Sequence, residues 1–136
     1  MPIPEELRQA IDQALTAMRR HPEHDLPLGY RHAIWAALGP RDDAARGKMT
    51  AGHRRRAWLA IETARHVLPI WERDRPDDDT PQRILAEAEQ VLAGKIRVTQ
   101  ARRDVGKFWS HMDDVADETE GGNPAPVGYA AVQALA

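Results

Sequence analysis

Hydrophobic residues recur along most of the chain at intervals of three and four positions, which is the period of an α-helix. The first such set is Leu7, Ile11, Leu15 and Met18. Pro4 precedes this set and Arg19 and Arg20 follow it, as the ends of a helix prefer. We therefore predict a first helix over roughly residues 4 to 20. A short second helix ends at Gly39, and residues 40 to 52 are predicted to form a loop.

The third predicted helix, roughly residues 53 to 75, carries apolar side chains on more than one side. One face contains Ala57, Ile61, Ala64, Leu68 and Trp71. Leu59 and Ile70 project from nearly the opposite side, and Trp58 projects from a flank. We interpret this segment as a central helix that is covered on more than one side and kinked at Pro69, whose ring disturbs the preceding turn.

Three more helices follow. Thr80 and Pro81 begin the next one, with the Thr80 hydroxyl as its predicted cap, and Thr99 is predicted to cap the fifth. Residues 120 to 126 are predicted to form a turn-rich loop, and residues 127 to 136 a last helix that stops abruptly, so the natural chain is expected to extend further or to be supported there by a partner. The prediction is an all-α protein: a single compact bundle of about five to six helices around the central helix, forming one domain over residues 1–136.

The overall charge excludes some partners. The chain has 19 Lys and Arg against 21 Asp and Glu, a net charge of −2, so no global field attracts it to DNA or to an anionic membrane. It has no cysteine, no apolar stretch long enough to span a membrane and no beginning that resembles a signal peptide. We expect a cytoplasmic protein with no membrane partner.

Residues that could carry chemistry are sparse. The run Asp77-Asp78-Asp79 could bind Mg²⁺, but carboxylates just before a helix also complement its positive end. Two sets could ligate zinc in principle, His21 with His24 and His111 with Asp113, although neither has a recognised spacing. The single serine, Ser110, has no glycine elbow. We therefore expect no catalytic residue, no metal and no cofactor, and we predict that the protein is not an enzyme.

The basic run Arg54-Arg55-Arg56 leaves a nucleic-acid alternative open. Successive residues on a helix point about 100° apart, so these three do not form one patch, and they could equally solvate or pair a helix end. We expect no nucleic-acid partner. A helical DNA-binding regulator or a small protein-interaction adaptor remains the alternative function.

Acidic residues crowd the end of the fifth predicted helix. They are Asp113, Asp114, Asp117 and Glu118, followed by Glu120. The helix dipole disfavours negative charge at this end, so the sequence accepts a local cost there. Solubility is one explanation. The functional hypothesis is that these five residues form an acidic face that binds a basic protein partner.

The chain also resembles the fifth family of immunity proteins from bacterial polymorphic toxin systems. The residues that carry the resemblance are Arg65-His66-Val67-Leu68-Pro69-Ile70-Trp71-Glu72, Pro76-Asp77-Asp78-Asp79-Thr80-Pro81, Val91-Leu92-Ala93-Gly94 and Gly128-Tyr129-Ala130-Ala131. The resemblance implies an all-helical cytoplasmic protein that binds and blocks a cognate toxin domain by occluding its surface. It implies no catalytic residues, and it does not identify the toxin.

Overall fold

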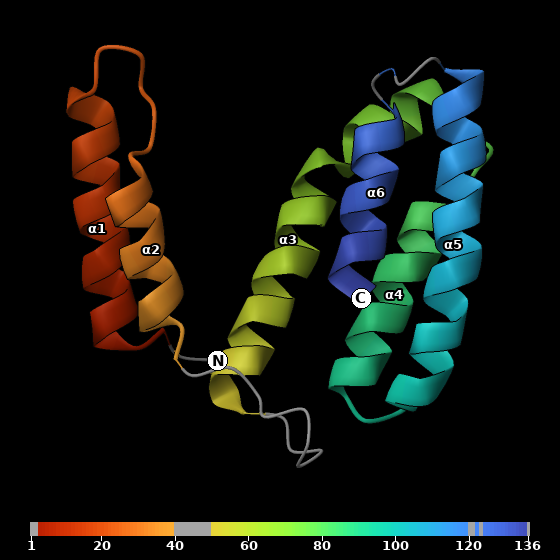
Figure 1. Cartoon of the computed structure of the whole chain (residues 1–136), viewed down its shortest axis with the longest axis horizontal. Helices are drawn as coiled ribbons and strands as arrows, with labels where there is room; N and C mark the ends of the chain where they lie inside the picture. The colour runs from red at the N-terminus through yellow and green to blue at the C-terminus, as the bar shows by residue number, and fades with distance from the viewer. Residues whose placement is uncertain (1–2, 40–49, 120–121, 123, 136) are drawn as a thin grey trace. The chain divides into compact units, whose positions relative to one another are not determined.

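The computed structural model describes residues 3–39, 50–119, 122 and 124–135, and these contain α-helices and no strand. The helices are α1 (Glu5–Arg20), α2 (Leu28–Ala37), α3 (Ala51–Asp74), α4 (Thr80–Leu92), α5 (Val98–Glu118) and α6 (Pro124–Leu135), as Figure 1 shows. The all-α class and the number of helices are confirmed. Over the described ranges, no helix is both long enough and apolar enough to cross a membrane.

The chain divides into two compact units, residues 1–56 and residues 57–136. The boundary falls within α3, so the first turns of this helix belong to the first unit and the remaining turns to the second. The single domain expected over residues 1–136 stays a prediction.

The first unit is a pair of helices, α1 and α2, that pack against each other. Its buried apolar side chains are Leu7, Ala14 and Leu38. Two aromatic residues of α2 stay largely outside this small core, because Tyr30 is 39% exposed and Trp35 is 49% exposed. The hairpin therefore has little buried apolar surface to stabilise it.

The second unit is built around α6, which packs against both α4 and α5. This helix has no charged residue and buries Pro124, Ala125, Val127, Gly128, Ala131, Val132 and Leu135. At Gly128 a Cβ atom would overlap the Met112 sulfur and lie 3.0 Å from Cζ3 of Trp71. Only glycine allows α6 to approach these two buried side chains so closely. The last helix is thus supported by α4 and α5 of the same chain.

In the second unit, one side of α3 is buried. Ile61 and Trp71 are fully buried, as the helical period predicts, whereas Leu59 is 46% exposed and Trp58 and Ile70 are also exposed. The prediction of cover on more than one side is wrong for these residues. Pro69 lies inside the helix, and a kink there stays a prediction.

Three predicted helix starts also need correction. The last helix begins at Pro124, because proline is tolerated in the first turn, where the backbone N–H has no helical partner. The Thr80 hydroxyl donates to Asp78 and does not cap α4, whose N-cap is Asp79. Thr99 lies inside the first turn of α5, after an N-cap at Arg97.

Candidate functional site

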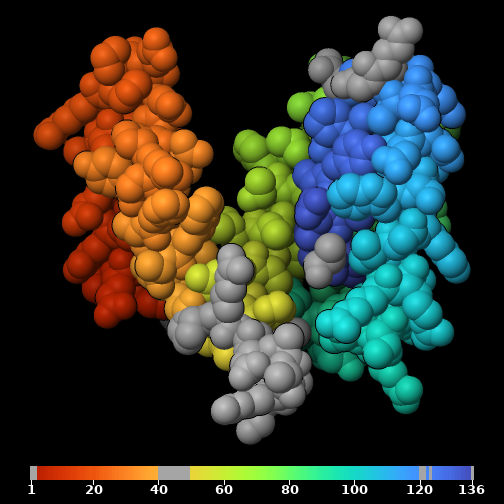
Figure 2. Space-filling model, viewed as in Figure 1, coloured from red at the N-terminus to blue at the C-terminus, as the bar shows by residue number. Residues whose placement is uncertain are grey.

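The acidic residues predicted to bind a partner lie on the C-terminal half of α5. Asp113, Asp114, Asp117 and Glu118 are all exposed, and Glu120 lies outside the described residues. The space-filling view shows α5 at the surface, with α6 beside it (Figure 2). Exposure of these carboxylates is a condition for the binding role, and it is met at the four described positions.

The helical period separates these acids into two columns. At about 100° per residue, Asp113 and Asp117 are neighbours one turn apart, and so are Asp114 and Glu118 on a different side of α5. We call the first pair the α6-side acids, because Asp113 contacts Tyr129 of α6, and the second pair the α3-side acids, because Glu118 contacts Arg75, the residue that follows α3. The two columns have different surroundings and are considered in turn.

The α6-side acids lie next to two aromatic side chains. The Tyr129 hydroxyl of α6 donates a hydrogen bond to Oδ1 of Asp113 at 2.5 Å. The ring of Tyr129 packs against that of Trp109, with centroids 5.3 Å apart and planes inclined by 53°. The hydrogen bond to Asp113, together with burial and the charges of Asp113 and Asp117, raises the pKa of Tyr129 above its ordinary value. This column therefore combines exposed negative charge with an ordered aromatic pair.

One of the α3-side acids, Glu118, joins a network of ion pairs. Nη1 of Arg75 lies 3.1 Å from Oε2 of Glu118, and Nε of Arg75 lies 3.8 Å from Oδ2 of Asp78. His111 contacts the same Asp78 oxygen at 2.8 Å. Arg75 also stacks over the ring of Trp71, at 5.8 Å from its centroid. Part of the predicted acidic face thus stabilises the junction of α3, α4 and α5.

Asp78 is the centre of that network. Its carboxylate accepts hydrogen bonds from the backbone N–H of Thr80 at 3.0 Å and from the Thr80 hydroxyl at 2.5 Å. Burial tends to raise the pKa of Asp78, but the hydrogen bonds from Thr80 and His111 and the charge of His111 outweigh it and lower the pKa. The Trp71 indole N–H donates to the backbone oxygen of Asp78 at 2.7 Å. The middle residue of the Asp77-Asp78-Asp79 run therefore organises the turn before α4.

The metal hypotheses gain no support. Among the residues that the structure describes, no group of three or more His, Asp or Glu side chains is arranged to hold a metal ion. His111, proposed with Asp113 as a zinc ligand, contacts Asp78 instead. His21 lies at the end of α1 and accepts hydrogen bonds from the backbone N–H groups of Glu23 and Asp25.

The basic run at the start of α3 caps another helix. Arg55 donates to the backbone oxygen of Leu38 at 3.0 Å, and Arg56 donates to those of Trp35 and Gly39, each at 2.6 Å. The last carbonyls of a helix lack helical partners and carry partial negative charge, which cations stabilise. Two of the three arginines considered for DNA thus stabilise the end of α2.

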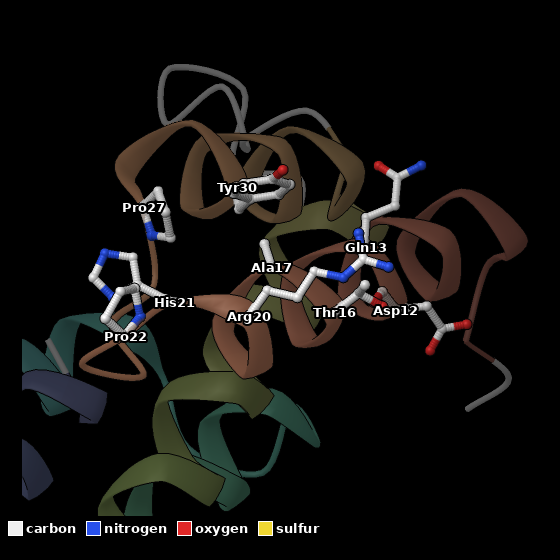
Figure 3. Close-up of a pocket in the computed structure, with 9 residues that line it drawn as sticks. All are labelled: Asp12, Gln13, Thr16, Ala17, Arg20, His21, Pro22, Pro27 and Tyr30. Carbon is white, nitrogen blue, oxygen red and sulfur yellow. The ribbon is translucent and has the colours of Figure 1, made fainter.

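The first unit also contains an open groove of about 700 Å³ between α1 and α2 (Figure 3). Its lining is Asp12, Gln13, Thr16, Ala17, Arg20, His21, Pro22, Pro27 and Tyr30. Asp12, Arg20 and Tyr30 are exposed, so the ionisable groups here do not converge in a dry site of the kind that catalysis needs.

Sequence reasoning missed a carboxyl pair between α4 and α5. Burial and the neighbouring Asp104 raise the pKa of Glu87 to about 7, from an ordinary value of 4.5. The available signal was that Glu87 lies three residues after Ile84 and four before Val91, at the edge of the apolar face of α4. Pairing across helices cannot be read from that spacing.

Two tryptophans that follow the apolar spacing of their helices differ in exposure. Trp71 is fully buried, whereas Trp109 is 38% exposed. A side chain that is exposed beside charged groups has the surroundings of an interface residue rather than those of a core residue.

The described residues form an all-α protein with exposed acids on α5 and an ion-pair network centred on Asp78. The chain matches the family described as Immunity protein Imm5 over residues 11–136, and it belongs to that family. This confirms the resemblance seen in the sequence and extends it into α1. Searches of curated proteins and of solved structures find no match.

Proposed function

We propose that this protein binds a cognate toxin domain of a bacterial polymorphic toxin system in the cytoplasm and blocks it by covering part of its surface. Membership of the Imm5 family supports a toxin as the partner. A protein of this kind needs a complementary surface of about 800 Å² and no catalytic group. It acts by binding, without a cofactor.

We infer the location of this surface from the exposed acidic residues on the C-terminal half of α5. Asp113, Asp114 and Asp117 are exposed near the C-terminus of a helix, where the dipole makes negative charge unfavourable. A basic partner removes this cost and is attracted from a distance. The toxin surface that faces α5 is therefore proposed to be basic, as the substrate channel of a nuclease is.

The first test is co-expression with any toxin domain that is found to be encoded beside this chain. The proposal predicts that the chain rescues growth and co-purifies with an inactivated form of that domain. A toxin that still arrests growth and forms no complex would contradict the function itself.

The second test addresses the surface. We expect the quadruple variant Asp113→Asn, Asp114→Asn, Asp117→Asn and Glu118→Gln to associate at least about tenfold more slowly at low salt and to lose most of the salt dependence, because charge complementarity acts mainly on the association rate. The matched control is Glu5→Gln, Glu6→Gln, Asp12→Asn and Glu23→Gln, which neutralises four exposed carboxylates of the first unit. Equal association kinetics for the two variants would remove α5 from the proposal.

A further inference from the structure

The ring pair formed by the exposed Trp109 and the half-buried Tyr129 differs from the other aromatic contacts of the second unit. Trp71 is fully buried and its indole N–H is satisfied by the backbone oxygen of Asp78. Trp109, in contrast, lies at the surface and is 38% exposed, and its ring packs against that of Tyr129, with the centroids 5.3 Å apart. Large aromatic side chains of this type dominate binding energy where they meet a partner.

Negative charge surrounds this pair on one side. Asp113 follows Trp109 by four residues, one helical turn or about 6 Å along the axis, and Asp117 follows by a second turn. The Tyr129 hydroxyl holds Oδ1 of Asp113 at 2.5 Å. The carboxylate is therefore fixed next to the ring pair, and it has a second oxygen with which to bind a donor.

This combination fits one side chain better than any other. A guanidinium stacks on an aromatic face by cation–π attraction and presents N–H groups in a planar fork that suits a carboxylate. An ammonium ion has neither the plane nor the fork. The two arginines of α5 itself are not placed to fill this position, since Arg102 precedes Trp109 by about two turns and Arg103 points to another side of the helix.

We propose that Trp109, Tyr129 and Asp113 form a receptor for an arginine side chain of the protein partner, with Asp117 extending the attraction to neighbouring basic groups. The inference rests on the proposed function for the identity of the partner as a toxin domain. It goes further by naming the side chain that the toxin inserts and the residues that receive it.

The receptor is tested first without the toxin, by titrating the ¹⁵N-labelled full chain with a hexa-arginine peptide. The indole N–H signal of Trp109, assigned with Trp109→Phe, is expected to shift together with the amides of residues 109–117. Trp109→Ala and Asp113→Asn are each expected to weaken binding at least fivefold, and Tyr129→Phe, which removes only the hydroxyl, about threefold. Hexa-lysine is expected to bind at least threefold more weakly than hexa-arginine.

Two controls separate recognition from folding and from general charge attraction. Trp58→Ala removes an equally exposed tryptophan from α3 and is expected to leave peptide binding unchanged. Trp109→Phe keeps an aromatic face and is expected to bind with intermediate affinity. Each variant is compared at equal helical circular dichroism, so that a loss of binding in Trp109→Ala with an unchanged spectrum reports on the receptor.

The outcomes distinguish the receptor from the proposed function. Shifts that occur only away from residues 109–117, unchanged affinity in Trp109→Ala, or equal binding of the two peptides would overturn the receptor. The same Trp109→Ala variant is then assayed with the inactivated adjacent toxin domain, where a loss of at least tenfold in affinity supports the receptor. A toxin complex that tolerates Trp109→Ala would overturn the receptor and leave the proposed function intact, whereas a peptide response with no toxin complex would support the receptor and contradict the function.

Discussion

The two units of the molecule differ most in how much apolar surface they bury. In the described part of the chain, the second unit contains sixteen buried apolar residues and the first unit three. The second unit therefore has a core of the ordinary kind, assembled around the uncharged helix α6. The first unit depends on the packing of α1 against α2 and on Arg55 and Arg56 of α3, which donate hydrogen bonds to carbonyls at the end of α2.

The units also differ in what their charged residues do. In the first unit, Arg55 and Arg56 at the start of α3 donate hydrogen bonds to carbonyls at the end of α2. In the second unit, Arg75 forms an ion pair with Glu118, which is itself exposed, as Asp114 and Asp117 are. A cluster of like charges in a sequence therefore does not indicate one role, and the partner of each side chain has to be known.

The largest expected difference between the units is the cost of removing a core side chain. Ile84→Ala leaves a cavity at a fully buried position of the second unit, and we expect it to lower the free energy of unfolding by about 2–5 kcal/mol. Leu15→Ala in the first unit, where the side chain is 37% exposed, should cost less than about 1 kcal/mol. Urea denaturation of the two variants measures both values. Equal costs would mean that the first unit has a core as deep as that of the second.

A glycine substitution is also expected to lower the stability more in the second unit than in the first. Gly128→Ala forces a methyl group against Met112 and Trp71, and we expect overpacking to cost about 1–3 kcal/mol. Gly29→Ala in α2 meets no atom within 4 Å, so it should be neutral or stabilise the protein by up to about 1 kcal/mol through helix propensity. Thermal unfolding compares them, and Gly106→Ala in α5, which also has open space, is a control within the second unit. A harmless Gly128→Ala would show that α6 does not pack this closely.

The cap on α2 provides a smaller and more local effect. Arg56→Ala removes the donor to the backbone oxygens of Trp35 and Gly39, which we expect to cost about 1–2 kcal/mol. Hydrogen exchange should report faster exchange in α2 and unchanged exchange in α4. The control is Arg19→Ala, an exposed arginine of α1. Uniform acceleration across both units would contradict a local role for Arg56.

The smallest effect concerns pH and is confined to the second unit. The folded-state pKa of Glu87, about 7, lies above its ordinary value of 4.5, so the folded protein retains a proton that the unfolded chain loses between these values. Stability is therefore expected to fall as pH rises from about 4.5 to about 7. Glu87→Gln should flatten this fall and stabilise the protein at pH 8 by about 1 kcal/mol, after discounting for solvent screening.

Denaturation midpoints at pH 5 and pH 8 measure the Glu87 effect. Glu72→Gln, at an exposed position of α3, is the matched control and should leave the pH dependence as it is in the native chain. A Glu87→Gln variant with the native pH profile would show that Asp104 and burial do not act on this carboxyl.

The sequence predicted the elements better than it predicted their contacts. The periodicity of Leu7, Ile11 and Leu15 correctly indicated α1, because a helix needs only local information. The start of α6 was missed because Pro124 and Pro126 are typical of loops and are equally allowed in the first turn of a helix. The position of α6 between α4 and α5 depends on contacts that are distant in sequence, so no local pattern could reveal it.

The acidic residues show the same limit. Their number and their place at the end of α5 were visible in the sequence, but the different surroundings of the two columns depend on Arg75, which follows α3, and on Tyr129 of α6. Trp71 and Trp109 both follow apolar spacing, yet one is buried under α6 and the other lies beside Tyr129 at the surface. Spacing alone does not state which neighbours cover a side chain.

Hydroxyl-radical footprinting of the complex with the inactivated toxin domain tests most directly that the second unit carries the binding surface. Each unit offers an exposed tryptophan with a tyrosine, Trp109 with Tyr129 in the second and Trp35 with Tyr30 in the first. The account predicts that the toxin protects Trp109 and Tyr129 from oxidation and leaves Trp35 and Tyr30 as reactive as in the free protein. Protection of Trp35 and Tyr30 with Trp109 unchanged would contradict it.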